Sequence, residues 1–293
     1  MTADWVKWRT SKPTSAHWYG LEHFIRLISA YIAHDRDRGT DRTVREVVAE
    51  FLGLKATAKQ TKVLEQTGLT RVTLSTLVEN GELNKDKVAL LLSAMQQHSK
   101  PVEPKHLGFI GRDNLTSKFA ALGCEMESFD YRRILGETDE KLPFVIEAAF
   151  AMCKDQSKRR LVTGVNWSPG IQNQFRNLGA SGLSLDSILE QQRVGSKEPV
   201  VFLLHCACPR VEYTDRGKAA VVVGDITSNG IISAVTGVTK KWAKQRKAEE
   251  RDVSRRYNRN AVMTRSYRTS IKEVAWEVME EAVSQEKIHR RWT

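Results

Sequence analysis

The chain has 293 residues with a formal net charge of +11 at pH 7, and 41% of its residues are hydrophobic. This length and hydrophobic content allow one large domain or two medium-sized domains with a buried core. A run of about 18 apolar residues is absent, which excludes a transmembrane helix, and the first residues lack the apolar segment of a signal peptide, so we expect a cytoplasmic protein.

The first hundred residues are predicted to be helical. Residues 21–32 carry apolar side chains at helical spacing, and residues 41–100 contain four further amphipathic segments joined by glycine turns. Because helices this short cannot fold singly, we expect a compact helical module. The four segments are residues 44–52, 57–65, 70–77 and 84–95, the last with Asn84 as its N-cap.

Three lysines surround the turn between the first two of these helices, namely Lys55, Lys59 and Lys62. Lysines beside a helix N-terminus suit contacts with phosphate, although surface lysines without a function are equally common. A proline-broken connector, residues 99–111, then marks a domain boundary.

After the connector the pattern changes to strands. Residues 144–150 alternate with a period of two, residues 160–166 form a second strand, and residues 199–208 are too apolar for the edge of a sheet. Residues 183–192 are helical, and residues 219–223 begin either a strand or a helix. A long helix from about residue 231 and a last amphipathic helix, residues 271–283, complete the chain. We therefore predict an α+β fold, with a small helical domain followed by a two-layer α/β domain.

The four cysteines are Cys124, Cys153, Cys206 and Cys208. Structural zinc requires four ligands, and the segment His205–Cys208 has no second pair of ligands in sight. We expect buried, reduced thiols and no metal site.

Positive charge is concentrated in residues 240–268, which hold eleven Lys or Arg against three acidic residues, a net charge of +8. Such a concentration is typical of a protein with an anionic partner, most often nucleic acid, whereas a solvated helix face without a partner is the alternative. The candidates for DNA contact are Lys240, Lys241, Lys244, Arg246, Lys247, Arg251, Arg255 and Arg256.

Motifs of free-standing enzymes are missing from the sequence. We find no phosphate-binding loop of the G-x-x-x-x-G-K-[ST] type, no H-E-x-x-H and no G-x-S-x-G. The chain is a better candidate for part of an enzyme than for a complete one.

Several segments, in order, resemble one family. FLGLKATAKQTKVLEQTGL, LNKDKVALLLSAMQQ and SKPVEPKHLGFIGRDNL resemble the helix-two-turn-helix insert and the connector of the DNA topoisomerase VI B subunit. LPFVIEAAFA, GVNWSPGI and PVVFLLHCACPRVEYTDRGKAA are similar to the transducer domain of that subunit, which has the fold of the second domain of ribosomal protein S5. The resemblance covers roughly residues 10–260.

The resemblance implies a domain order. Residues 1–40 would leave an ATPase domain, residues 41–111 would form the helix-two-turn-helix domain, residues 112–262 the transducer and residues 263–293 a helical tail. The ATPase domain of the GHKL class is missing from the sequence, so ATP and Mg would be bound only by a separate or missing domain. The implied partners are double-stranded DNA, that ATPase domain and the DNA-cleaving A-like subunit.

The resemblance also assigns a role to Lys218, which would reach the γ-phosphate of ATP and sense its presence. Gly217 would shape the turn that carries this lysine, and Asn166 and Pro169 would shape a neighbouring loop. Two alternatives stay open: a stand-alone DNA-binding module with a helix-turn-helix, and a protein–protein scaffold.

Overall fold

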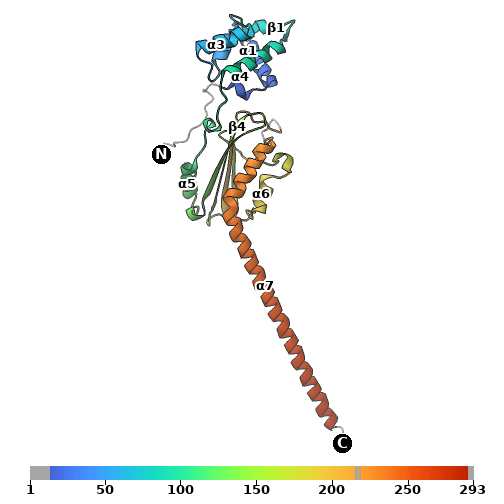
Figure 1. Ribbon diagram of the computed structural model, residues 1–293. Helices are drawn as coiled ribbons and strands as arrows, with labels where there is room; N and C mark the ends of the chain where they lie inside the picture. Colours follow the sequence, from blue (N-terminus) through green and yellow to red (C-terminus); the bar gives the residue numbers. More distant parts are fainter. Residues whose placement is uncertain (1–13, 215–216, 218, 290–293) are drawn as a thin grey trace. The chain divides into compact units, whose positions relative to one another are not determined.

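The computed structural model describes residues 14–214, 217 and 219–289, with side chains described as far as residue 284 (Figure 1). The chain divides into two compact units, Met1–Thr239 and Lys240–Thr293. It is an α+β protein with a mixed sheet and a long C-terminal helix, which confirms the predicted fold class in these general terms. None of the described helices is long and apolar enough to cross a membrane.

The N-terminal helices pack around one aromatic cluster. The rings of Tyr19, Phe24 and Phe51 meet edge to face, with centroids 5.8 to 6.0 Å apart. The buried carboxylate of Asp35 accepts two 2.8 Å hydrogen bonds from the Arg42 side chain, which joins the end of α1 to the start of α2. These helices are η1 (Ala16–Trp18), α1 (Leu21–Arg38), α2 (Val44–Ala49), α3 (Thr57–Thr67), η2 (Leu74–Leu77) and α4 (Lys85–His98).

The prediction that residues 41–100 are entirely helical is wrong at one place. Strands β1 (Val78–Glu79) and β2 (Glu82–Leu83) pair as an antiparallel hairpin after the short helix η2. The turn residues Asn80 and Gly81 both have positive φ, 52° and 84°, as a type I′ turn requires. The Asn–Gly pair therefore turns a hairpin here and does not end a helix.

A five-stranded mixed sheet with the order β3-β4-β7-β5-β6 forms the centre of the α/β region. Strand β7 lies inside the sheet, antiparallel to β4 and parallel to β5, as its apolar sequence predicted. Strand β4 is buried on both faces. The strands are β3 (Asp130–Glu137), β4 (Pro143–Met152), β5 (Arg160–Val165), β6 (Ser168–Pro169) and β7 (Val200–Ala207).

Helices lie on both faces of this sheet (Figure 1). On one face, Leu115 and Phe119 of α5 pack in a cluster with Ala149 and Ala151 of β4. On the other face α7 approaches β4 so closely that a Cβ on Gly230 would come within 2.8 Å of the Ile146 side chain. The helices of this region are η3 (Pro104–Leu107), α5 (Arg112–Ala121), η4 (Met126–Ser128), η5 (Gly179–Ser181), α6 (Leu185–Gln191) and α7 (Asp225–His289).

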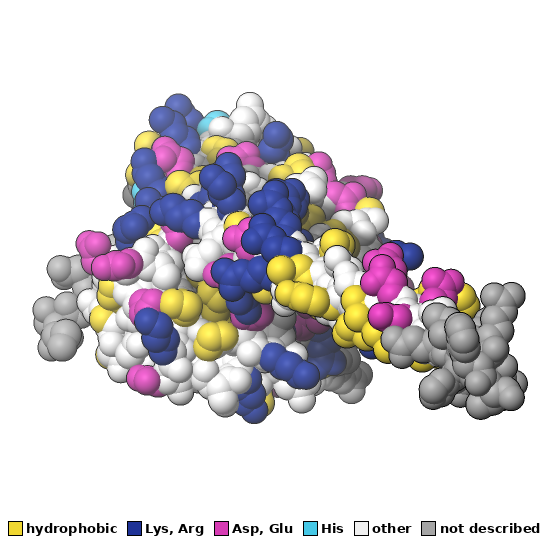
Figure 2. Space-filling view, turned by 90° about the horizontal axis from the view of Figure 1, so that it is seen from below, with side chains coloured by type: hydrophobic (Ala, Val, Ile, Leu, Met, Phe, Trp, Pro, Cys, Tyr) yellow, Lys and Arg dark blue, Asp and Glu magenta, His cyan; other side chains and the backbone are white. Residues whose placement is uncertain are grey.

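The two predicted C-terminal helices are a single helix, α7. The predicted apolar stripe is buried at Ile231, Val235, Val238 and Trp242. Residues 263–270 contain neither glycine nor proline, so the sequence offers no helix-breaking residue before residue 271. Residues 247–284 are exposed, and hydrophobic and acidic side chains gather near the carboxyl end of the helix (Figure 2).

Cys124 and Cys153 form a disulfide, so the expectation of four reduced thiols is wrong for this pair. Cys124 follows α5 and Cys153 follows β4, and the packing of α5 on β4 brings their Cα atoms to 4.1 Å. Cys206 and Cys208 are free, and burial raises the pKa of both thiols.

We predict that Phe202→Ala lowers the free energy of unfolding by about 3–5 kcal/mol, because it leaves a cavity in the middle of the sheet. Phe202 is fully buried in β7. The half-exposed Val222 provides the control, and Val222→Ala is expected to change stability by no more than about 0.5 kcal/mol. Urea unfolding followed by circular dichroism measures both, and equal losses would contradict the interior position of β7.

Candidate functional site

The turn between β5 and β6 is held against the segment that follows β7. Asn166 and Trp167 form this turn with positive φ angles of 48° and 70°, and Pro169 of β6 pairs with Gly164. The Asn166 amide donates to the Cys208 carbonyl at 2.7 Å and accepts from the Cys208 N–H at 2.8 Å. Asn166 therefore fixes the start of the loop that leads towards residue 218.

That loop is closed at its base. Tyr213 and Val221 form an isolated antiparallel bridge, and the Thr214 N–H donates to the Ala220 carbonyl at 3.0 Å. Gly217 lies at a turn between them, while Lys218 lies outside the described residues. The loop connects β7, which ends at Ala207, with α7, which begins at Asp225.

Strand β4 carries a buried carboxylate, that of Glu147, opposite His205 of β7. Both of its oxygens are fully used, because each accepts two hydrogen bonds. The donors are the N–H groups of Ile110 (2.7 Å) and Gly111 (2.8 Å), the hydroxyl of Tyr131 (2.8 Å) and Nδ1 of His205 (2.9 Å). The sequence alone does not mark Glu147 as a functional residue, because Glu147 is a single polar position in an otherwise apolar strand. The one signal in the sequence that could have indicated a buried polar site is a carboxylate in a predicted strand that is otherwise uncharged.

The charge of Glu147 is stabilised by these donors. Burial raises the pKa of its carboxyl group, but the hydrogen bonds from His205, Gly111, Ile110 and Tyr131 outweigh that effect and hold the pKa below its usual value. Burial and the neighbouring carboxylate raise the pKa of Tyr131, which keeps this hydroxyl protonated as a donor. An ionised Glu147 can only accept, so the proton of a neutral His205 lies on Nδ1.

The Lys and Arg side chains of α7 between residues 240 and 272 are exposed, apart from the partly buried Arg246. Arg246 donates to Glu249 at 2.9 Å and its guanidinium lies 5.1 Å from the Trp242 ring centroid, while Arg255 forms a 3.8 Å ion pair with Asp252. Within the described residues, several other Lys and Arg side chains of α7 have no ion-pair partner. These are Lys240, Lys244, Lys247, Arg251 and Arg256.

The three lysines of the helical region differ in their contacts. Lys59 donates to the Gly53 carbonyl at 2.9 Å and so closes the turn between α2 and α3. Lys55 and Lys62 are exposed. Lys55 lies just before α3 and Lys62 in its second turn, so the structure brings these lysines to the N-terminal half of one helix.

Cys206, Cys208 and His205 do not converge on a metal site. His205 and Cys206 are neighbours on β7 and therefore point to opposite faces of the sheet. Among the described residues, no group of three or more His, Cys, Asp or Glu side chains could hold a metal ion.

No protein-family model and no curated protein matches this chain. The solved structures with some likeness to it include the B subunit of DNA gyrase from Myxococcus xanthus, at 10% identity over 39% of this chain and 34% of that one. Another is the ATP-binding domain of topoisomerase IV from Francisella tularensis in complex with a small-molecule inhibitor, at 12% identity over 47% of this chain and 40% of that one. Both have a TM-score of 0.27, which is too low to establish a shared fold.

We predict that Glu147→Gln lowers the free energy of unfolding at pH 7 by roughly 2–3 kcal/mol. The glutamine NH₂ group would replace one carboxylate oxygen and would face hydrogen-bond donors that then have no acceptor. The exposed Glu137 of β3 provides the control, and Glu137→Gln is expected to have little effect.

The pH dependence has a definite sign. Because the folded pKa of Glu147 is depressed, its contribution is fully present above the unfolded value of about 4.3 and is lost as the pH falls through the folded pKa. Denaturant unfolding between pH 7 and pH 3 should show this loss in the unmodified protein and not in Glu147→Gln. Parallel pH profiles would contradict an ionised Glu147.

Proposed function

We propose that the chain acts as part of a topoisomerase VI-like B subunit, in which it contacts duplex DNA through α7 and couples the nucleotide state to the DNA gate. The observation that carries the DNA-binding part is the exposed, largely unpaired set of Lys and Arg side chains on α7. The sequence resemblance to the helix-two-turn-helix insert and the transducer supports the remainder.

Five of these cations share one face of the helix. At about 100° per residue, Lys240, Lys244, Lys247, Arg251 and Arg255 fall within an arc of about 80°. The distance from Lys240 to Arg255 is 15 residue steps along the helix, or roughly 22 Å, and duplex DNA carries a negative charge about every 1.7 Å along its axis. A cationic stripe of this length suits phosphates along a groove edge, and phosphate contacts carry no base specificity.

The coupling part rests on the loop between β7 and α7. We propose that Lys218 in this loop senses the γ-phosphate of an ATP held by a separate GHKL domain. A lysine provides a point charge on a long stem, which suits detection of a terminal phosphate. Its loop is closed at Tyr213 and Val221, and α7 begins four residues later, at Asp225. A shift of the loop would therefore act directly on the start of the helix.

The far end of α7 is suited to a protein partner. Ile271, Val274 and Val278 are all more than half exposed and lie at helical spacing on one face. Glu273 and Glu277 lie among them, so this segment is less favourable for DNA. We propose that it docks on the DNA-cleaving A-like subunit.

The helix-turn-helix alternative is less favoured. A helix-turn-helix reader joins its two helices by a short turn, whereas α3 and α4 are separated by η2 and the β1–β2 hairpin. The scaffold alternative has no specific observation in its favour.

We predict that replacing Lys244, Lys247, Arg251 and Arg255 by Gln weakens binding to a random-sequence duplex by more than about tenfold at physiological salt. The slope of log K against log salt should fall by up to about 3–4, at roughly 0.9 per lost phosphate contact. Four exposed lysines elsewhere, Lys85, Lys141, Lys158 and Lys197, provide a control of equal charge change. Equal weakening by both sets would reduce the effect to net charge and contradict a role for α7.

A second prediction concerns Lys218 in the assembled enzyme with its ATPase domain and A-like subunit. Lys218→Ala should lower ATP turnover and strand passage by about tenfold or more while DNA binding stays the same, because only phosphate sensing is lost. The exposed Lys197→Ala is the matched control. Unchanged turnover and strand passage in Lys218→Ala would refute the assignment.

A further inference from the structure

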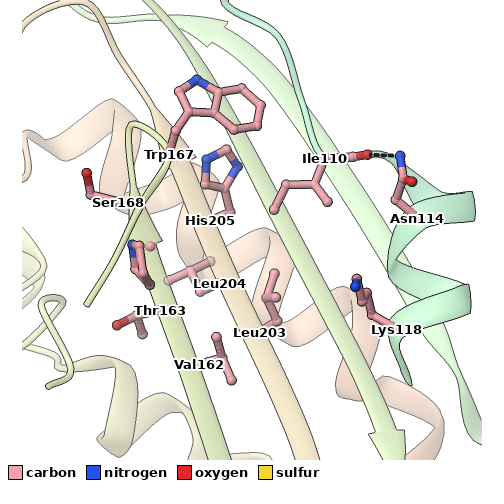
Figure 3. Close-up of a pocket in the computed structure, with 12 residues that line it drawn as sticks. Ile110, Asn114, Lys118, Val162, Thr163, Trp167, Ser168, Leu203, Leu204 and His205 are labelled. Carbon is pink, nitrogen blue, oxygen red and sulfur yellow. Dashed lines mark hydrogen bonds between the residues drawn. The ribbon is translucent and has the colours of Figure 1, made fainter. Parts of the chain in front are cut away.

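A pocket of about 300 Å³ lies on the face of the sheet that α5 covers only in part (Figure 3). Its floor is formed by Val162 and Gly164 of β5 and by Leu203 and His205 of β7. One wall comes from Ile110 and α5, and the other from the β5–β6 turn and β6. This volume is at the lower end of the range for small-molecule sites.

The lining is largely apolar, with one buried polar atom that lacks a partner. Nε2 of His205 makes no hydrogen bond with any described residue, and the side chain is 4% exposed. When the ring is neutral, Glu147 holds its proton on Nδ1, and Nε2 then carries an unshared electron pair. A buried acceptor without a hydrogen-bond donor is unfavourable. A ligand that brings an N–H or O–H group to Nε2 would remove this unfavourable feature.

An indole ring lies at the same end of the pocket. The ring centroids of Trp167 and His205 are 4.9 Å apart, with Trp167 above the imidazole (Figure 3). Trp167 adopts a φ of 70° at the second position of a turn where glycine is usual. A large side chain in this backbone conformation is uncommon, and such residues cluster at ligand-binding sites.

We propose that this pocket binds a small planar aromatic molecule that carries an N–H or O–H donor. The donor would reach Nε2 of His205, and the ring would lie between Trp167 and the apolar floor of Val162 and Leu203. An aromatic ring fits the flat, apolar walls and stacks favourably on an indole. The inference does not depend on the proposed DNA-related function.

The test compares indole with benzothiophene, which has nearly the same shape but no N–H donor. We expect indole to bind the full chain saturably and at least about tenfold more tightly than benzothiophene, since only indole satisfies the buried acceptor. Nitrogen-15 NMR of the imidazole should show a shift of the His205 Nε2 resonance on addition of indole. Equal affinities, tighter benzothiophene binding, or no saturable binding of indole would overturn the proposal.

Two variants locate the binding. Val162→Phe enlarges a side chain of the pocket floor while Glu147 and His205 stay unchanged in sequence, and it should abolish indole binding. Ile171→Phe, at a fully exposed position outside the pocket, should leave indole binding unchanged. Undiminished indole binding to a folded Val162→Phe would place the site elsewhere and overturn the proposal. If Val162→Phe does not fold, the Nε2 shift in the unmodified chain decides the question.

Discussion

The carboxylate of Glu147 joins four segments that are distant in sequence: the connector before α5, strand β3, strand β4 and strand β7. An ionised carboxylate is unfavourable in a protein interior unless donors replace its water. Here four donors do so, two from successive backbone N–H groups at Ile110 and Gly111. The positive φ of Gly111, 87°, is open to glycine and rare in other residues, so the connector is suited to this contact by its sequence. The carboxylate in turn fixes the tautomer of His205 and thereby the character of the pocket.

Helix α5 is held on β4 at both ends. Glu147 binds the two residues just before the helix, and the disulfide joins Cys124, just after it, to Cys153 at the end of β4. Between these fixed points Leu115 and Phe119 pack on the sheet. Helix α5 also supplies one wall of the pocket. The width of the pocket is therefore set by the contacts that hold α5 on β4. Asn166 in the β5–β6 turn is hydrogen-bonded to Cys208 at the start of the loop that precedes α7. These hydrogen bonds connect the turn that carries Trp167 with the proposed sensing loop.

Local patterns in the sequence were sufficient for much of the fold. Asn84 is the N-cap of α4, its side chain accepting from the Lys87 N–H at 3.0 Å, and β7 lies in the sheet interior, as its apolar run predicted. The hairpin at Asn80–Gly81 was within reach of sequence reasoning, because this pair is a strong hairpin signal. Strand β3 was not, since charged residues such as Arg132 and Arg133 hide its alternation.

Contacts between distant segments could not be predicted in this way. Nothing in the local sequence marks Cys124 and Cys153, 29 residues apart, as a disulfide pair. Nor does it show that Glu147 of β4 lies opposite His205 on the neighbouring strand β7. The residues proposed to contact DNA could be selected from the sequence because the choice depends on charge density alone, and their role stays a prediction. The pocket was not, because its walls come from the connector, α5, β5, β6 and β7, and only the packed chain brings them together.

The ionised Glu147 and the tautomer that it imposes on His205 are the central claim. Long-range nitrogen–hydrogen NMR correlation of the imidazole of the unliganded chain at pH 8 tests it directly, because the two ring nitrogens differ in shift when only one is protonated. The structure predicts a proton on Nδ1 and none on Nε2. A spectrum with the proton on Nε2 would mean that Glu147 does not accept from His205, and would contradict both the network and the acceptor in the pocket.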